Sequence, residues 1–507
     1  MANDIPVNVN DETEITDFLL NVHEKYYCEL KTASNLPKSF WESYSSFCNT
    51  AGGLIILGVK ENEPQNEIFG VGNESKIIAD LWSLLSNPNK VSCRTIDNED
   101  VLTKKVGEAK IIFIHVPEAH ESQKPVYLDG KQEKTYIRTG DGDRLATSEE
   151  INAFIRNAHP GADSIYADHC SMEDLDSISI TSFKAMVHKR YPKKKYIEMD
   201  NEEFLVQIGA CTRKKDTGSL RIKRGTVLFL GKYNAIKELY PVYHLDYFNK
   251  RGSNPRWSDR ISDDEPNDDE MNIFNFYSQV YAKLKAVLQD SFQLDEEYQL
   301  RLPVSDFDET IRECLVNCLA HADYIQGFPS TKIEVYDGWF RFDNPGKMLV
   351  SKAQFIMGGD SRPRNEIVMK FFRLLGASER QGFGGPLIYK SAYEHQYRNP
   401  EVETNLEHTE LRVWNIDLAD SYPNLEQEQK AVIRLIMKNG PLSVHELLKY
   451  INISDYKLRK LLVPLEGNLL QKIGKGPSTK YDLMPRSVEK LTQLQIAMDH
   501  IQKHWIV

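Results

Sequence analysis

Three carboxylates and a lysine near the N-terminus are spaced so that they could meet at one end of a small sheet. Hydrophobic spacing predicts a helix over residues 11–25 and an extended strand over 27–31. Glu24 and Glu29 fall on either side of the bend between these elements, which allows their carboxylates to converge. Glu29 and Lys31 are two residues apart on the strand, so their side chains point to the same face.

A third carboxylate, Glu61, follows a glycine turn and a second strand predicted over residues 54–59. Mg²⁺ and Mn²⁺ prefer oxygen ligands, and lysine supplies a compact positive charge. The residues therefore indicate a site for phosphodiester hydrolysis. Glu24, Glu29 and Glu61 would hold the metal, and Lys31 would stabilise charge on the scissile phosphate. The alternative is an ordinary exposed strand with glutamate and lysine on its solvent face.

About the first 160 residues resemble the Schlafen AlbA-type domain of animal Schlafen proteins and of many bacterial chains. Residues 136–151 match the closing strand and final helix of that domain. The other matching motifs are E-x4-E-[LF]-K at Glu24, Glu29 and Lys31, S-x-F-x-N-T-x-G-G at residues 45–53, and G-V-x-[DE] at 58–61. In members that cut transfer RNA or ribosomal RNA, three acidic residues occupy the motif positions; the third is aspartate there and Glu61 here. Other bacterial members are labelled as DNA-binding or regulatory proteins.

A second group of polar residues lies on a helix predicted over residues 308–324. Its apolar residues form one face, whereas Glu313 and Asn317 are i,i+4 neighbours on another. An asparagine oxygen can ligate Mg²⁺, and a glutamate can take a proton from water. Polar pairs at this spacing are also common on exposed helix faces, so the pair alone leaves a structural role open.

Glycine-rich segments follow this helix. Strands predicted over residues 332–336 and 339–342 flank Asp337-Gly338, which is a strong hairpin signal. Residues 382–385 contain three glycines and precede a segment, 387–392, that is predicted to be helical. Backbone N–H groups at the start of a helix can bind phosphate, so this segment is a candidate phosphate loop.

Residues 255–420 resemble a divergent GHKL-type ATPase that often follows a Schlafen AlbA-type domain in bacteria. The signature R-E-x2-V-N-x3-H-x-D-Y is matched over residues 312–324. The resemblance implies that Glu313 is the general base and that Asn317 is a Mg²⁺ ligand. The remaining implied ATP contacts are Asp343 to the adenine amino group, Gly346 in the same loop, and Gly382, Gly384 and Gly385 along the triphosphate.

Two further segments of this region bear on nucleotide binding. The adenine loop reads D-N-P-G, where better-studied GHKL members have D-x-G-x-G. Residues 361–365, Ser-Arg-Pro-Arg-Asn, match a family loop near the nucleotide, where an arginine could neutralise phosphate charge.

The last stretch of the chain predicts three short helices and a two-stranded hairpin, an order that resembles a winged helix. The helices are predicted over residues 425–438, 443–451 and 455–465, and the strands over 469–473 and 479–483. Lys457, Arg459 and Lys460 lie on the third helix, which would be the recognition helix, and are candidate nucleic-acid contacts. Winged helices also serve as dimer or docking modules. A closing helix is predicted over residues 489–504.

A connector over residues 161–254 joins the two main regions. It predicts helices over 178–191 and 201–208 and a buried strand over 225–231. Residues 189–195, Lys-Arg-Tyr-Pro-Lys-Lys-Lys, form a basic run within it. Such runs are usually solvated surface, and this one is a candidate nucleic-acid patch.

The composition limits the classes of protein that the chain can form. Its 507 residues are too many for one ordinary domain, and 41% hydrophobic and 27% charged residues are typical of globular domains. The sequence lacks a span of about 20 apolar residues and a signal peptide, so we expect a cytoplasmic location. The net charge of −11 requires local basic patches for any nucleic-acid contact. Seven scattered cysteines indicate reduced thiols, and Cys314 and Cys318 are expected to be core residues rather than zinc ligands with His321.

The sequence therefore predicts an α+β multidomain chain. The expected domains are residues 1–160 (Schlafen AlbA-like), 161–254 (connector), 255–422 (GHKL-like α/β sandwich), 423–485 (winged helix) and 486–507 (C-terminal helix). The leading hypothesis is a metal-dependent nuclease controlled by ATP, acting on structured RNA such as transfer RNA and suited to bacterial defence against phage. One alternative is an ATP-binding transcriptional regulator that binds DNA without cutting it; another is an ATPase whose Schlafen-like domain only docks partners. A homo-oligomer is expected by analogy with GHKL relatives.

Overall fold

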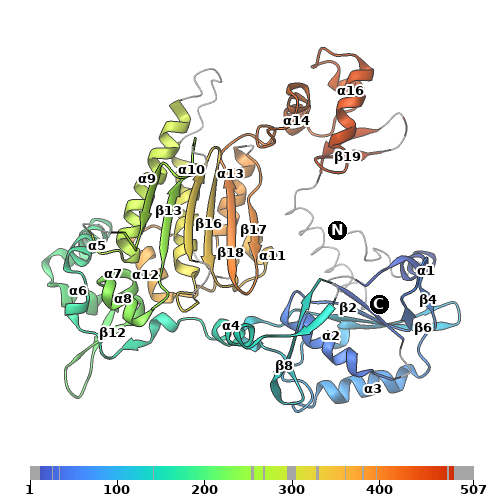
Figure 1. Ribbon diagram of the computed structural model, residues 1–507, viewed down its shortest axis with the longest axis horizontal. Helices are drawn as coiled ribbons and strands as arrows, with labels where there is room; N and C mark the ends of the chain where they lie inside the picture. The colour runs from blue at the N-terminus through green and yellow to red at the C-terminus, as the bar shows by residue number, and fades with distance from the viewer. Residues whose placement is uncertain are drawn as a thin grey trace. The chain divides into compact units, whose positions relative to one another are not determined.

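The chain folds into two compact units; within the described residues, unit 1 ends at His159 and unit 2 begins at Pro160 (Figure 1). The computed structural model describes residues 12–484, apart from residues 25–26, 33–34, 141, 253–255, 266–268, 294–303, 327–329, 360, 379–381, 396, 475 and 477–478. The closing helix predicted over 489–504 lies outside the described residues. The two units are described separately.

Unit 1 is built on a four-stranded sheet in the order β1-β2-β6-β5. The strands are β1 (Cys28–Lys31), β2 (Gly53–Leu57), β5 (Val101–Val106) and β6 (Ala109–Val116). β1 and β2 run parallel, with Glu29 beside Ile55, and the other neighbours are antiparallel. The expected strand and its parallel neighbour are therefore present, and they place Glu29 and Lys31 in the sheet.

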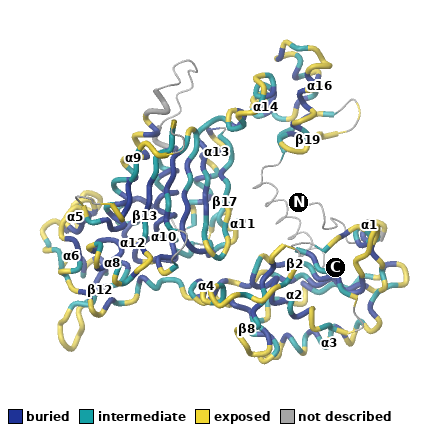
Figure 2. The backbone as a smooth tube through the Cα atoms, in the orientation of Figure 1, coloured by how far each residue is buried: buried dark blue, intermediate teal, exposed yellow. Residues whose placement is uncertain are grey.

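Both faces of this sheet are covered, because alternate residues of β2 are apolar on both sides. Ile55 and Leu57 pack in the cluster that contains α2 (Lys38–Asn49) and α3 (Glu74–Leu85), whereas Ile56 packs in the cluster that contains α1 (Glu12–Asn21). Figure 2 shows buried residues along β2 and α2 and exposed residues on α1 and α3.

The remaining elements of unit 1 form a hairpin, a second small sheet and a final helix. The hairpin pairs β3 (Val59–Lys60) with β4 (Glu67–Ile68), and the sheet pairs β7 (Tyr127–Leu128), β8 (Lys131–Thr139) and β9 (Gly142–Leu145). The helix α4 (Ser148–Ala158) begins at a capping box between Thr147 and Glu150. The predicted closing strand and final helix are thus confirmed.

The described strands at the centre of unit 2 form a six-stranded sheet in the order β14-β13-β15-β16-β18-β17. They are β13 (Leu245–Asn249), β14 (Asp259–Ser262), β15 (Thr331–Tyr336), β16 (Trp339–Pro345), β17 (Glu401–Thr404) and β18 (His408–Trp414). The hairpin predicted at Asp337-Gly338 joins β15 to β16. Helices pack on one face of this sheet (Figure 1), namely α9 (Ile273–Gln293), α10 (Val304–His321), α12 (Glu366–Leu375) and α13 (Gly384–Glu394). A short helix, α11 (Lys352–Met357), precedes α12.

The connector shares its hydrophobic core with this sheet and its helices. It contains α5 (Ser177–Arg190), α6 (Asn201–Gln207), α7 (Arg224–Leu230), α8 (Tyr233–Leu239) and a small sheet of β10 (Tyr166–Ala167), β11 (Cys211–Arg213) and β12 (Leu220–Lys223). The boundary expected between residues 254 and 255 falls inside this unit, since β13 lies before it and pairs with β15. The connector and the sheet are therefore one packed body.

The strand predicted over residues 225–231 is wrong, because this segment is the helix α7. Its apolar residues are buried on every side, so the run has no polar face to reveal a helical period. Phe229 packs against Phe274 of α9 and against Phe371 and Phe372 of α12, with ring centroids 5.9, 5.2 and 5.1 Å away. Burial against α9 and α12 stabilises a helix here rather than a strand.

The first residues of the connector cap α12. Asp163 is buried, and its Oδ2 accepts hydrogen bonds from the N–H groups of Ile367 and Val368 at 2.8 and 3.1 Å. The N–H of Gly161 donates to the carbonyl of Arg364 at 2.9 Å. A side chain distant in sequence thus satisfies the N-terminal donors of α12.

The C-terminal part follows the predicted order of elements: α14 (Gln427–Asn439), α15 (Val444–Leu447), α16 (Asp455–Leu462), β19 (Leu470–Ile473) and β20 (Lys480–Leu483). Ser454 accepts a hydrogen bond from the N–H of Lys457, as expected for the cap of α16. Its assignment as a winged helix stays a prediction.

All seven cysteines carry free thiols. Within the residues that the structure describes, no helix combines the length and apolar character needed to cross a membrane.

Candidate functional site

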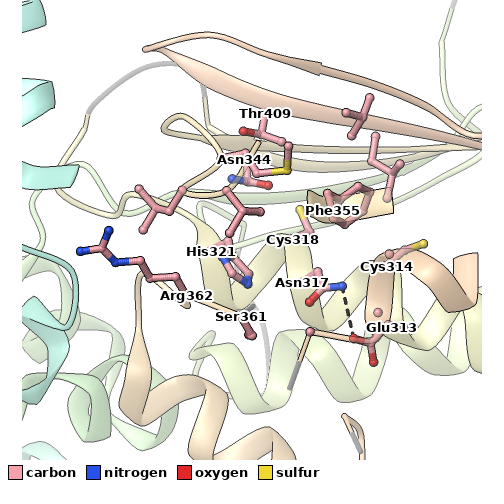
Figure 3. Close-up of a pocket in the computed structure, with 18 of the residues that line it drawn as sticks. Glu313, Cys314, Asn317, Cys318, His321, Asn344, Phe355, Ser361, Arg362 and Thr409 are labelled. Atoms are coloured by element: carbon pink, nitrogen blue, oxygen red, sulfur yellow. Dashed lines mark hydrogen bonds between the residues drawn. The ribbon is translucent and has the colours of Figure 1, made fainter. Parts of the chain in front are cut away.

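A pocket in unit 2 lies between α10, the sheet and the glycine-rich start of α13 (Figure 3). Glu313 and Asn317 of α10 line one end, and Asn344 and Thr409 of β16 and β18 line the other. Apolar side chains form much of the wall between them, including Cys314, Cys318, Phe342, Phe355, Met369, Val402 and Leu411. The pocket is therefore apolar along its length and polar at both ends.

Glu313 and Asn317 are adjacent, as their spacing predicts. The Nδ2 of Asn317 lies 3.3 Å from the Oε1 of Glu313, and Glu313 is 8% exposed. Burial raises the pKa of Glu313 to about 7, while the hydrogen bond from Asn317 and the charge of Arg312 oppose the rise. A carboxyl with this pKa can accept a proton from water near neutral pH.

The start of α13 is packed against this pair. A Cβ added to Gly384 would lie 2.4 Å from the Oε1 of Glu313 and 2.8 Å from the Nδ2 of Asn317. A Cβ added to Gly385 would overlap the backbone carbonyl of Phe355. Among the described residues, no side chain caps the helix at Phe383. The first N–H groups of a helix lack intrahelical partners, and the first two residues of this helix, Gly384 and Gly385, line the pocket. Gly382 also lines the pocket, and all three predicted phosphate-loop glycines are thus at the site.

Asp343 lies outside the pocket, contrary to the role implied for it. Side chains alternate along β16, and Phe342 and Asn344 face the pocket while Asp343 faces the opposite side of the sheet. There the carboxylate of Asp343 binds Arg341 at 2.8 Å and the Nδ1 of His408 at 2.9 Å. Asn344, which is 6% exposed, lines the pocket in its place.

Gly346 does not line the pocket but allows the loop after β16 to turn. Its φ is +91°, and an added Cβ would lie 2.9 Å from the Cβ of Asp323. Arg364 holds the same loop, because its guanidinium donates to the carbonyls of His321 and Lys347 at 3.1 and 2.8 Å. The arginine of the 361–365 segment that lines the pocket is instead Arg362, together with Ser361.

Three positively charged side chains, Lys347, Arg362 and Arg373, line the pocket. Sequence motifs predict only an arginine of the 361–365 segment near the nucleotide; Lys347 and Arg373 carry no motif that singles them out. His321 adds no charge near neutral pH, because burial and the charge of Arg364 lower its pKa to about 4. An anionic ligand therefore meets local positive charge in a chain of net negative charge.

In unit 1, the structure brings Glu24 and Glu61 together. The backbone N–H of Glu24 donates to the Oε1 of Glu61 at 2.9 Å, and the Oε1 of Glu24 accepts from the N–H of Leu30 at 3.1 Å. Burial, followed by the charges of Glu29 and Glu61, raises the pKa of the Glu24 carboxyl. The charges of the other two predicted carboxylates therefore act on Glu24.

Glu29 is already engaged by two cations. Its Oε1 is 2.8 Å from the Nζ of Lys31, and its Oε2 is 2.7 Å from an Nη of Arg138, a buried arginine that also binds Asp143 at 2.8 Å. Among the described residues, no group of three or more histidine, cysteine or acidic side chains is arranged to hold a metal ion. In this conformation the three glutamates do not fit a three-carboxylate metal site.

The predicted contacts on α16 lie at the surface, and two of them are paired with acidic side chains. Lys457 binds Glu428 at 2.7 Å, and Arg459 binds Asp455 at 2.6 Å. Lys460 is exposed on the same helix. Since both pairs offset positive charge, this helix presents a weaker basic surface than its sequence indicates.

Comparison with known families identifies three segments of the chain. Residues 24–147 match the family model "Schlafen, AlbA_2", and residues 330–413 match "Putative ATP-dependent DNA helicase recG C-terminal". Residues 152–246 match a domain of unknown function, DUF8451. The chain thus combines a Schlafen AlbA_2 domain with an ATPase-like domain in a mixed α/β architecture, and the resemblances drawn from its motifs are confirmed at this level.

Solved structures that align with the chain include the following two. The DIP2311 protein from Corynebacterium diphtheriae is 15% identical, with a TM-score of 0.40, over 92% of this chain and 94% of that one. The N-terminal domain of a "Putative ATP-dependent DNA Helicase RecG-related Protein" from Nitrosomonas europaea is 26% identical, with a TM-score of 0.21, over 27% of this chain and 95% of that one. No curated protein matches the chain.

Proposed function

We propose that unit 2 binds ATP with Mg²⁺ and hydrolyses it in the pocket between α10 and α13. The observation that carries this proposal is the position of Glu313, a buried carboxyl with a pKa near 7, beside Asn317 and the uncapped start of α13. A buried acid in this state is costly for stability, and such residues cluster at functional sites.

The chemistry follows from the two ends of the pocket. The amide of Asn344 would read the adenine edge, with the apolar wall against the ring. The N–H groups at Gly384 and Gly385 and the charges of Lys347, Arg362 and Arg373 would hold the phosphates. The amide oxygen of Asn317 suits Mg²⁺, which is usually held by few protein ligands and by substrate phosphates, and which would neutralise charge on the phosphates. Glu313 would take the proton from the attacking water.

Replacing Asn317 with alanine is expected to weaken ATP binding in the presence of Mg²⁺ by roughly 10- to 100-fold, because a ligand of the bound metal is lost. Isothermal titration with a nonhydrolysable ATP analogue, with and without Mg²⁺, measures this change. The exposed Asn468→Ala is the matched control and should bind as the native chain does. If the native chain, the Asn317 variant and the Asn468 control bind the analogue with equal affinity, the pocket is not the site of ATP and Mg²⁺ binding.

We further propose that the chain acts on nucleic acid in an ATP-dependent manner, since residues 330–413 match a family described as the C-terminal part of a putative ATP-dependent DNA helicase. Within this proposal, the second candidate function is a metal-dependent nuclease centred on Glu24 and Glu61, with structured RNA such as transfer RNA as substrate and phage defence as the biological setting. The observation that favours it is the repulsion that the charges of Glu29 and Glu61 exert on the partly buried carboxylate of Glu24, which a bound cation would relieve. A regulator that binds without cutting is the competing outcome.

Native chain is expected to bind Mn²⁺ more tightly than the double variant Glu24→Gln, Glu61→Gln, because the variant removes the repulsion that the cation relieves. Calorimetric titration with Mn²⁺ measures the difference, and labelled transfer RNA and DNA report cleavage in the same buffers. Binding of nucleic acid without cleavage, together with equal Mn²⁺ affinity in both proteins, would support the regulator instead.

A further inference from the structure

Exposed basic residues gather on one part of unit 2 that neither proposed site uses. They come from three segments: the loop after α5, the hairpin between β11 and β12, and α12. The basic surface is defined here as Lys193, Lys194, Lys214, Lys215, Lys223 and Lys370. Five of these six are exposed, and Lys223 is partly buried. The tip of the hairpin projects as an exposed loop near β12 (Figure 2).

α12 joins these segments into one surface. A Cβ added to Gly209, just before β11, would lie 2.8 Å from the Nζ of Lys370, so the start of the hairpin lies against the middle of α12. A Cβ added to Gly376 would overlap the guanidinium of Arg190, so the end of α5 lies against the end of α12. Residues 370 and 376 are roughly 9 Å apart along the helix axis. The loop and the hairpin are therefore neighbours across α12.

The loop after α5 is held rigidly although its basic residues are exposed. Tyr196 is buried, and its ring packs on Phe204 with centroids 5.5 Å apart. Lys184 ties the following turn to α5 by donating to the carbonyl of Met199 at 2.8 Å. A rigid loop loses little conformational entropy when it binds a ligand, so Lys193 and Lys194 are presented at low entropic cost.

The lysines of this surface differ from the cations around them in having no ion-pair partner among the described residues. Other cations of these segments are paired, as in Lys195 with Glu198, Arg213 with Glu202, and Arg221 with Asp168. In the described part of the chain, none of the six lysines of the basic surface forms an ion pair. Burial and the positive charge of Lys223 also lower the pKa of Lys370. Cations that repel one another gain free energy from a polyanion.

We propose that the basic surface binds the phosphodiester backbone of nucleic acid. This inference rests on the proposed action on nucleic acid and assigns the contact to the connector and α12 rather than to unit 1 or α16. Met369 and Arg373 of the same helix line the nucleotide pocket. Nucleic acid on the outer side of α12 and ATP on its inner side thus share one rigid element, through which each site can affect the other.

The test is the salt dependence of binding to fluorescently labelled transfer RNA and, separately, duplex DNA, using the full chain. The variant Lys193→Ala, Lys194→Ala, Lys214→Ala, Lys215→Ala removes four exposed charges. The control Lys285→Ala, Lys390→Ala, Lys438→Ala removes three exposed charges elsewhere. For duplex DNA, the magnitude of the slope of log K against log salt is expected to fall by about 3.6 in the variant, since each lost phosphate contact contributes about 0.9, and to be unchanged in the control.

Two results for the salt slope would overturn the inference: a slope in the variant equal to that of the native chain, or an equal change of slope in the control. The inference would also be overturned if the native chain bound anionic vesicles but bound neither transfer RNA nor duplex DNA. Titration with the ATP analogue separates this inference from the proposed function. If the native chain binds both nucleic acid and ATP but the variant has the same salt slope as the native chain, only the binding of nucleic acid by the basic surface is rejected. If native chain binds no nucleic acid, the proposed action on nucleic acid falls with it.

Discussion

Glu313→Gln is expected to lower the rate of ATP hydrolysis by about 100-fold or more while ATP still binds, because loss of a general base has an effect of this size. Glutamine keeps the shape of the side chain and its contact with Asn317, so the pocket itself should persist. Phosphate release under saturating ATP and the affinity for ATP measured separately give the two quantities. Glu309→Gln, one turn earlier on α10, is the matched control and should keep the native rate. If the Glu313 variant hydrolyses ATP at the native rate, Glu313 is not the general base.

The same residue predicts how the native rate and stability depend on pH. Hydrolysis should rise with pH up to about 7, where Glu313 loses its proton, and then level off. The folded chain binds this proton more tightly than the unfolded chain, whose glutamates titrate near 4.5. Its contribution to stability is therefore full below pH 4.5 and is lost as the pH rises through 7. Glu313→Gln should accordingly match the native chain at pH 5 and exceed its stability at pH 8 by up to about 3 kcal/mol.

Thermal unfolding of both proteins at the two pH values measures that difference. A gap between the melting temperatures that is the same at pH 5 and pH 8 would show that Glu313 is not buried as described.

Arg138→Ala is expected to destabilise unit 1 by about 3 to 5 kcal/mol, because it leaves two carboxylates partly buried without their cation. Arg138 is 4% exposed, binds Glu29 and Asp143, and donates to the carbonyl of Cys28 at 3.2 Å. It thereby joins β8 and β9 to β1. Hydrogen exchange of peptides that contain β1 and β2 in the full chain measures the loss of local stability.

Arg144→Ala is the matched control, since the side chain of Arg144 is 44% exposed and bound to Glu150. An exposed pair of this kind contributes up to about 1 kcal/mol, so exchange should change little. Equal protection in the Arg138 variant and the native chain would contradict a structural role for Arg138. The same contacts bear on tests of the nuclease: Glu29→Ala removes a partner of Arg138, so Glu29→Gln is the better probe of chemistry.

Periodicity predicted most elements because their apolar and polar residues alternate at a regular spacing. The helices around Glu313 and the strands around Asp337-Gly338 lie where the pattern predicts them, and so does β1 with Glu29 and Lys31. Adjacency of Glu313 and Asn317 follows from helix geometry alone. α7 could not be predicted in this way, because a segment that is apolar on every side has no period, and its neighbours in α9 and α12 are distant in sequence.

Asn344 and Arg138 illustrate two further limits. The period of two along β16 could have identified Asn344, since it shares the face of Phe340 and Phe342, but motif matching led to Asp343. Arg138 gave no such signal, because a buried arginine is recognised only when the carboxylates that surround it are placed in space. Likewise, the pairing of Lys457 and Arg459 with acidic residues weakens a basic helix that the sequence presents as a binding surface.

The most direct measurement is a crystal structure of the chain with a nonhydrolysable ATP analogue and Mn²⁺, with anomalous scattering to locate the metal. The account predicts adenine beside Asn344, phosphates at Gly384 and Gly385, and Mn²⁺ at the amide oxygen of Asn317. An analogue bound outside this pocket, or a pocket that stays empty at saturating analogue, would contradict it.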